Sequence, residues 1–254
     1  MVRTQQTGPV LSVVLSRPEA LNALTPGMLR ELAAVVEAAG QSSEVRVIVV
    51  SGDGDRAFSA GYDIASIPEG GAEFEPEALL DGAADALQQC PRPIIAKIRG
   101  LCMGGGCDVA LACDVRIAAD STAFAIPAAR IGAVYPPAGV RRFLSTIGKA
   151  GVQELLLTGG RIGAARAREL DIVHRVVPSG ELDGEVSRLA GELADNAPLS
   201  MAATKLLLRE LAGEPRPGAD ARVSAMLEAV RSSADAREGK RAFLEKRRPR
   251  FTGA

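Results

Sequence analysis

The sequence predicts an α/β fold that ends in an all-helical C-terminal part. Short runs of β-branched residues alternate with helical patterns up to about residue 180. From about residue 181 onward the strand pattern stops and amphipathic helical patterns continue. The runs that we interpret as strands span residues 10–16, 45–51, 93–99, 114–120 and 171–177.

Two of the helical patterns have clear boundaries. In "TPGMLRELAAVVEAAG", Thr25 is placed to cap the helix, Pro26 occupies its first turn and Gly40 ends the run. The small apolar residues 105–112 predict a short buried helix. After residue 181, "ELDGEVSRLAGELADNAPLSMAATKLLLRELAG" predicts successive amphipathic helices.

The length and composition allow one large domain or one domain with a helical appendage. The chain has 254 residues, of which 47% are hydrophobic, so it can bury a sizeable core. We expect residues 1–195 to form the α/β core and residues 196–254 to form a helical subdomain. Residues 66–76, rich in Gly, Pro and Glu, predict a mobile loop that borders the functional site.

The charge balance disfavours nucleic acids and membranes as partners. Thirty basic and 31 acidic side chains give a net charge of −1, so no overall field attracts a polyanion. Aromatic residues make up 3% of the chain and Trp is absent, which leaves few platforms on which bases could stack. No leader pattern opens the chain and no apolar run is long enough to span a bilayer. We therefore expect a cytoplasmic protein with a small-molecule partner.

The four cysteines are expected to be buried, reduced thiols. None belongs to a C-x-x-C pair, so the sequence indicates neither a zinc site nor a disulfide framework. They lie in apolar or glycine-rich surroundings, where a free cysteine behaves as a small hydrophobic residue. They are Cys90, Cys102, Cys107 and Cys113.

Two small-residue turns that follow predicted strands are candidates for one site. "AFSAGYDI" contains Gly61 and Tyr62, and "LCMGGGCDVALACD" contains three successive glycines before a helix. If the backbone N–H groups of Tyr62 and Gly105 point into one cavity, they can hold a carbonyl oxygen as it gains negative charge. Gly105 would also start a helix, whose free N–H groups favour an anion. Close packing of the helix on the sheet is the alternative reason for the glycines.

Four motifs together resemble the enoyl-CoA hydratase/isomerase, or crotonase, family. They are "RPEALNAL", "AFSAGYDI", "GGGCDVALACD" and "DAREGKRAFLEKRRPRF", and the resemblance runs nearly from end to end. It implies a core spiral of ββα turns and a C-terminal helical part that forms a homotrimer or a dimer of trimers. It also implies an acyl-CoA thioester as the ligand, with coenzyme A as part of the substrate and no metal or redox cofactor.

The resemblance assigns binding roles to particular residues. The two oxyanion N–H groups correspond to those of Tyr62 and Gly105. Ala60 and the segment from Tyr62 through Asp63, Ile64 and Ala65 would line the coenzyme A channel, and Ala65 stands where many relatives have lysine. Phe243 and Lys246 match residues that touch coenzyme A, often from the neighbouring subunit, and the basic run 246–250 would serve its phosphates rather than a nucleic acid.

The family's hydratases use two glutamates, and the matching positions here hold Asp108 and Ala128. Asp108 lies one helical turn from Gly105 on the same face, so it can point at a substrate. Ala128 cannot transfer a proton, and a general base is commonly worth about 10²- to 10⁴-fold in rate. This loss favours a reaction other than hydration.

Decarboxylation of a malonyl-type or methylmalonyl-type thioester makes its own enolate and needs no base. Tyr135 in "GAVYPPAG" follows Gly105 by thirty residues, as in the methylmalonyl-CoA decarboxylase branch that this site resembles. That branch also lacks the second glutamate, but it carries glutamate where this chain has Asp108 and a larger polar residue where it has Tyr62. We therefore expect Tyr135 to bind the departing carboxylate.

Other classes of function remain as alternatives. Asp108 can act as the acid or base of an enoyl-CoA hydratase or isomerase, or the chain is a catalytically idle protein that binds coenzyme A. The single histidine, His174, lies in a predicted strand remote from the glycine turns, so a structural role is expected for it. A dinucleotide-binding oxidoreductase is disfavoured because "MGGGCDVA" lies mid-chain without the required glycine spacing.

Overall fold

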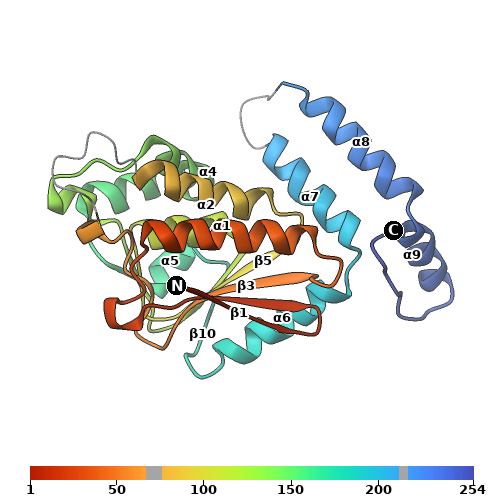
Figure 1. The fold of residues 1–254 in the computed structure, drawn as a ribbon, viewed down its shortest axis with the longest axis horizontal. Coiled ribbons are helices and arrows are strands. Elements are labelled where there is room, and N and C mark those ends of the chain that lie inside the picture. The colour runs from red at the N-terminus through yellow and green to blue at the C-terminus, as the bar shows by residue number, and fades with distance from the viewer. Residues whose placement is uncertain (67–75, 212–216) are drawn as a thin grey trace.

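The computed structural model describes residues 1–66, 76–211 and 217–254 and confirms an α/β fold with C-terminal helices (Figure 1). Within these residues a six-stranded sheet has the order β1-β2-β3-β5-β7-β10, and a four-stranded sheet has the order β4-β6-β8-β9. The strands are β1 (Val2–Thr7), β2 (Val10–Leu15), β3 (Val47–Gly52), β4 (Ala57–Ser59), β5 (Ile94–Ile98), β6 (Leu101–Met103), β7 (Val115–Ala119), β8 (Ala123–Ala125), β9 (Ile162–Gly163) and β10 (Arg175–Val177). The helices are α1 (Pro26–Gln41), α2 (Pro76–Gln89), α3 (Gly105–Ala112), α4 (Pro137–Thr158), α5 (Ala164–Glu169), α6 (Leu182–Asp195), α7 (Pro198–Leu211), α8 (Ala219–Ser232) and α9 (Ala234–Leu244).

The core repeats a strand–strand–helix unit. In the units β3-β4-α2, β5-β6-α3 and β7-β8-α4, the first strand joins the six-stranded sheet and the second joins the four-stranded sheet. The strands of successive units pair in parallel, β3 with β5 and β5 with β7 in one sheet, β4 with β6 and β6 with β8 in the other. Because parallel strands end at the same edge, the turns that follow β4 and β6 leave the small sheet side by side.

Helices cover both faces of the large sheet. Alternate residues of a strand point to opposite faces, and β3 is buried on both. Ile48 and Val50 belong to the cluster that contains the α1 and α2 side chains, whereas Val47 and Val49 pack with α6. Figure 1 shows α1 and α2 on one side of the sheet and α6 on the other.

The predicted helix over residues 26–40 is confirmed at its start and is one residue longer at its end. The Thr25 side chain accepts a hydrogen bond from the backbone N–H of Met28 at 3.2 Å, and Pro26 opens the helix. The helix continues through Gly40 to Gln41. The predicted helix over residues 105–112 is α3, with the same bounds.

Several elements of the structure differ from the predicted ones. The run 171–177 is a strand only over β10, because Asp171 takes a positive φ and the Arg116 side chain binds the carbonyl of Ile172. Strand β1, whose face carries exposed polar residues, and helix α4 were not predicted. Of the loop predicted over residues 66–76, residues 67–75 lie outside the described part.

The last three helices extend from the body on one side (Figure 1). Helix α7 contacts α2 and α8, and α8 contacts α9. The Lys205 ammonium of α7 is anchored to Asp114 at 2.6 Å and to the Arg92 carbonyl at 2.9 Å. After α9 the chain returns to the body, where the Arg46 guanidinium donates a hydrogen bond to the carbonyl of Phe251.

Candidate active site

The two glycine-containing turns meet at the edge of the small sheet. A Cβ atom built on Gly61 would lie 2.8 Å from the carbonyl oxygen of Met103 and 3.3 Å from the backbone nitrogen of Gly105. A Cβ built on Gly105 would lie 3.5 Å from the backbone nitrogen of Tyr62. The structure therefore brings together the two residues that the sequence singled out, and their backbones approach closely because neither glycine carries a side chain.

The three successive glycines serve different purposes. Gly104 has φ +48, a backbone conformation that side chains disfavour, and it turns the chain from β6 into α3. Gly106 packs on β4, since a Cβ there would lie 2.8 Å from the Ser59 side chain. Gly105 faces the Tyr62 amide and the Leu80 side chain of α2, which a Cβ would approach to 3.3 Å. Close packing thus explains Gly106, while Gly105 borders the space beside Tyr62.

Hydrogen bonds to the segment 21–24 hold the Tyr62 turn in place. The N–H of Ala60 donates to Leu21, and the N–H of Asp63 donates to the carbonyl of Leu24, each at 2.9 Å. Leu24 in turn donates to the carbonyl of Gly61 at 2.7 Å, so Leu24 and Tyr62 form a β-bridge. The position of the Tyr62 amide is therefore fixed by backbone contacts.

A buried polar cluster surrounds Asp108 one turn along α3. The Asp108 side chain is 0% exposed. The Tyr135 hydroxyl donates a hydrogen bond to its Oδ2 atom, and the Arg142 Nε atom donates to its Oδ1 atom at 3.0 Å. Arg142 also donates to Asp81 of α2 at 2.6 Å. The structure thus brings Asp108 and Tyr135 into direct contact and joins them to two residues that the sequence analysis missed.

Burial and the neighbouring charges shift the pKa values of the three groups in this cluster. Burial raises the pKa of Asp108 above its usual value, although Arg142 and the Tyr135 hydroxyl oppose the shift. Burial and the adjacent Asp108 raise the pKa of Tyr135 well above its usual value, so the phenol stays protonated and keeps donating. Burial lowers the pKa of Arg142, but Asp108 and Asp81 outweigh it and the net shift is upward. The cluster is a carboxyl group held by one cation and one neutral donor.

Helix α4 supplies three of the parts of this cluster. A Cβ built on Gly139 would lie 2.6 Å from the Tyr135 ring and 3.0 Å from Asp108 Oδ2, so Gly139 provides the space for both side chains. The Tyr135 ring packs edge-on against Phe143, with ring centroids 5.8 Å apart. The spacing of Gly139, Arg142 and Phe143 at i, i+3 and i+4 places them on one helical face, which is the signal that could have revealed Arg142.

Ala128, the other position at which the family's hydratases carry glutamate, packs on the hydrophobic core. It lies in the 3-10 helix Pro127–Ile131 and is half-buried, and its carbonyl accepts a hydrogen bond from Ala133 at 3.0 Å. Its methyl group offers no acid or base. Asp108 is therefore the buried carboxyl group that the described structure places beside the glycine turns.

The residues expected to bind coenzyme A fall into two separate places. Asp63 continues the Tyr62 turn and binds Arg17 through a 2.5 Å ion pair, while Ile64 and Ala65 follow it in an exposed 3-10 turn. Phe243 lies on α9 and is 83% exposed, and Lys246 follows the helix. Figure 1 shows α9 at the end of the helical extension, on the side away from α4. Within one chain the structure does not bring Phe243 and Lys246 close to the turns that contain Tyr62 and Gly105.

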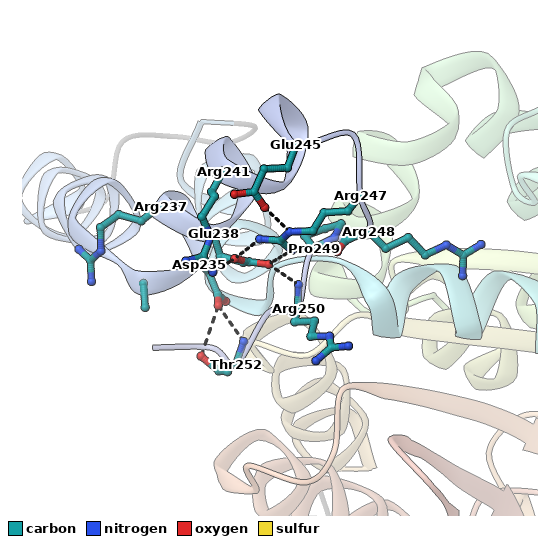
Figure 2. Close-up of a pocket in the computed structure, with 11 residues that line it drawn as sticks. Asp235, Arg237, Glu238, Arg241, Glu245, Arg247, Arg248, Pro249, Arg250 and Thr252 are labelled. Carbon is teal, nitrogen blue, oxygen red and sulfur yellow. Dashed lines mark hydrogen bonds and ion pairs between the residues drawn. The ribbon is translucent and has the colours of Figure 1, made fainter.

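The basic run at residues 246–250 folds back on α9 around a cavity of about 1170 Å³ (Figure 2). Glu238 accepts from Arg247 and Arg241, each at 2.6 Å, and from the backbone N–H of Arg250 at 3.0 Å. These hydrogen bonds hold the pKa of Glu238 below its usual value. In Figure 2 the guanidinium groups of Arg248 and Arg250 point away from Glu238.

Several other residues have structural roles. The four cysteines are buried free thiols, as predicted, and burial raises the pKa of Cys113 to about 12. His174 accepts a hydrogen bond from the backbone N–H of Arg116 through Nδ1 at 3.1 Å, and it links β7 to the turn before β10. No described helix has the length and hydrophobicity needed to cross a membrane. In the described ranges no group of three His, Cys, Asp or Glu side chains could hold a metal ion.

A spiral of strand–strand–helix units with C-terminal helices and two facing glycine turns defines a crotonase-fold protein. The sequence model of the enoyl-CoA hydratase/isomerase family matches residues 5–254. The chain belongs to this family and is an acyl-CoA enzyme of the crotonase type.

The relatives extend over the full length of the chain. It is 37% identical to a carnitinyl-CoA dehydratase of Proteus mirabilis, covering 97% of this chain and 96% of the relative. It is 35% identical to the carnitinyl-CoA dehydratase of Escherichia coli strain K12, covering 98% and 97%. The crystal structure of an enoyl-CoA hydratase/carnitine racemase from Magnetospirillum magneticum superposes with a TM-score of 0.92 at 30% identity, covering 100% of this chain and 96% of that one. None of these three is named a decarboxylase.

Proposed function

We propose that the chain removes water from, and adds it to, an acyl-CoA thioester through an enolate intermediate, with Asp108 as the single proton carrier. The N–H groups of Tyr62 and Gly105 would hold the thioester oxygen. The close approach of the two turns supports this, and so does the place of Gly105 at the first turn of α3, whose N–H groups have no acceptor within the helix. Two such donors stabilise the oxygen more strongly as it becomes negative.

The burial of Asp108 one turn from Gly105 is the observation that carries the choice of reaction. In dehydration of a 3-hydroxyacyl thioester, the Asp108 carboxylate takes the proton from Cα, and the C–H electron pair moves into the thioester as an enolate. The enolate then forms the Cα–Cβ double bond and expels hydroxide from Cβ. The hydroxide leaves as water with the proton that Asp108 returns. One carboxyl group therefore completes both proton transfers. The reaction needs no second acid or base at position 128, where Ala128 packs on the core.

The surroundings of Asp108 are suited to that exchange. Burial raises its pKa, which makes the carboxylate a better base, while Arg142 keeps its charged form accessible. The names of the full-length dehydratase relatives support the same reaction class. The hydroxyl of Tyr135 holds Asp108 by donating to it, so in this proposal Tyr135 orients the proton carrier.

For coenzyme A we propose a channel along Ala60 and the segment 62–65, which leads outward from the oxyanion turn. Phe243 lies on α9 and Lys246 follows it, and both are exposed, so we propose that they reach coenzyme A in a neighbouring copy of the chain. This assigns catalysis to residues 1–195 and self-association, as a homotrimer or a dimer of trimers, to residues 196–254. The molar mass of the protein, measured by light scattering as it elutes from a size-exclusion column, tests the assembly.

A second candidate is decarboxylation of a malonyl-type or methylmalonyl-type thioester, and Ala128 favours it. Loss of CO₂ breaks the bond between Cα and the carboxylate and leaves its electron pair in the enolate, which needs one proton from one donor. Tyr135 would have to turn from Asp108 to bind the departing carboxylate. A Tyr135→Phe enzyme that decarboxylates as fast as the wild type would remove Tyr135 from this role.

A substrate panel separates the two candidates. The wild type is incubated with crotonyl-CoA, 3-hydroxybutyryl-CoA, malonyl-CoA and methylmalonyl-CoA, and the products are followed by mass. Interconversion of the first two without loss of CO₂ from the others is the expected result. CO₂ release alone would replace the first proposal with the second, and coenzyme A binding without any turnover would favour an idle binding protein.

A Gly105→Ala variant tests the oxyanion hole in whichever reaction is found. Its methyl group would lie beside the Tyr62 amide, and the Leu80 side chain can move to admit it. The variant keeps the backbone N–H of residue 105, but its methyl group would occupy space in which the thioester oxygen would lie. We expect a loss of about 10²-fold or more in kcat, comparable to the effect of impairing one oxyanion donor. Gly184→Ala, at a helical position with open space around it, is the matched control and should keep full activity.

A further inference from the structure

A second cavity lies at the opposite end of α3 from Gly105. It has a volume of about 660 Å³ and lies between the carboxyl end of α3, helix α4 and helix α7. Its wall combines four cationic side chains with aliphatic ones, which include Leu144 and Leu208. The cationic residues are Arg141, Arg142, Lys205 and Arg209.

Two of the four cations are balanced by carboxylates. Lys205 pairs with Asp114 at 2.6 Å, and Arg142 binds Asp108 and Asp81. These pairs hold α7 and α4 against α3 and complete the walls of the cavity. These three carboxylates outnumber the two cations by one charge, so these pairs alone attract no anion.

The other two cations leave a positive excess at the cavity. Arg209 approaches Glu210 at 3.5 Å, but Glu210 also binds Arg222 at the shorter distance of 2.8 Å. The buried Nε atom of Arg209 has no hydrogen-bond partner among the described residues. Arg141 is exposed and forms no ion pair with the described residues. The cationic groups at the cavity and their printed partners thus exceed the carboxylates that bind them by one positive charge.

The carboxyl end of α3 does not account for this excess. A helix end carries about half an elementary negative charge, and that charge falls off within the last turn. One such end therefore offsets only part of an excess of one positive charge. A bound monoanion would complete the balance, and Leu144 and Leu208, both exposed, offer apolar contact for the body of the ligand.

We propose that this cavity binds a carboxylate monoanion with a short aliphatic chain, its head between Arg141 and Arg209 and its chain on Leu144 and Leu208. Arg142 forms part of the cavity wall and also contacts Asp108, so the site lies directly behind the proton carrier. The proposal concerns a site separate from the oxyanion turns and does not depend on which thioester is converted.

Calorimetric titration of the full-length protein with sodium hexanoate tests the proposal. The protein is first saturated with coenzyme A, so that the thioester site is filled, and 1-hexanol and inorganic phosphate are titrated in parallel. The test variant is Arg141→Gln with Arg209→Gln. The matched control is Arg161→Gln, an exposed arginine outside the cavity.

We expect hexanoate to bind once per chain and the double variant to weaken it by about tenfold or more, as expected for the loss of two charged contacts. The Arg161→Gln control should bind like the wild type. Absence of binding, equal affinity in the double variant, or binding of hexanol or phosphate as tight as that of hexanoate would overturn the proposal. No turnover is measured, so a failure here is distinct from a failure of the proposed reaction.

Discussion

The Nε atom of Arg142 donates a hydrogen bond to Oδ1 of Asp108 over 3.0 Å, and both side chains are withdrawn from solvent. The same guanidinium binds Asp81, so one side chain of α4 links α3 to α2. The carboxyl group that we propose as proton carrier is thus held from outside its own helix. Substitutions at Arg142 should therefore change both the free energy of unfolding and the pKa of Asp108.

Replacing Arg142 with glutamine should destabilise the protein strongly. The change leaves Asp108 buried without a cation, and breaking a buried ion pair from one side costs about 3–5 kcal/mol. The free energy of unfolding, measured in urea at pH 7, is expected to fall by that amount. An Arg142→Lys variant keeps the charge and should lose less, and equal losses in the two variants would argue against the ion pair as the cause.

The raised pKa of Asp108 predicts a specific dependence of stability on pH. Between the usual aspartate pKa of 3.8 and the raised value, the folded chain keeps a proton that the unfolded chain has lost. The free energy of unfolding should therefore fall as the pH rises through this window. Subtracting the urea-unfolding profile of Asp108→Asn from that of the wild type isolates this term, and a flat difference would contradict the raised pKa.

A Gly139→Ala substitution should damage the site although it lies in a helix, where alanine is usually favourable. Its methyl group would lie 2.6 Å from the Tyr135 ring and 3.0 Å from Asp108, so both side chains must move. Overpacking of this kind costs about 1–3 kcal/mol. Thermal unfolding measures the loss, and the helical Gly184→Ala variant, which meets open space, should show none.

His174 should remain neutral at pH values where an ordinary histidine is protonated. Burial lowers its pKa from 6.5 to about 4, with a further contribution from Arg116. Between these two pH values the unfolded chain binds a proton at His174 and the folded chain does not. The contribution of His174 to the free energy of unfolding is therefore fully present above pH 6.5 and declines as the pH falls toward 4. Since it is the only histidine, its ring resonances in an NMR titration report this pKa directly. A midpoint near 6.5 would be inconsistent with the structure.

The elements best predicted from the sequence are those whose boundaries depend on local chemistry. Thr25 and Pro26 define the start of α1, and the small apolar run defines both ends of α3. The run 171–177 was predicted poorly because a long-range contact, from Arg116 to Ile172, converts half of it into a turn. Such a contact leaves no periodic trace in the sequence.

The backbone part of the candidate site was predicted and the supporting side chains were not. Glycine turns after two strands led to the hypothesis that Tyr62 and Gly105 share a cavity, and the fold brings their backbones close together. Arg142 and Asp81 were missed because they reach Asp108 from two other helices. Tyr135 was found by its local setting, yet its contact with Asp108 depends on the space left by Gly139.

The burial of all four native thiols makes the chain convenient for spectroscopic labelling. Maleimide reagents need an accessible thiolate, which a solvent-excluded group such as Cys113 does not provide. A single cysteine introduced at an exposed position of α8 or α9 would then carry a fluorophore or spin label without removal of the natural residues. In the proposed assembly, distances between copies of the helical extension would become measurable in solution on the otherwise unaltered protein.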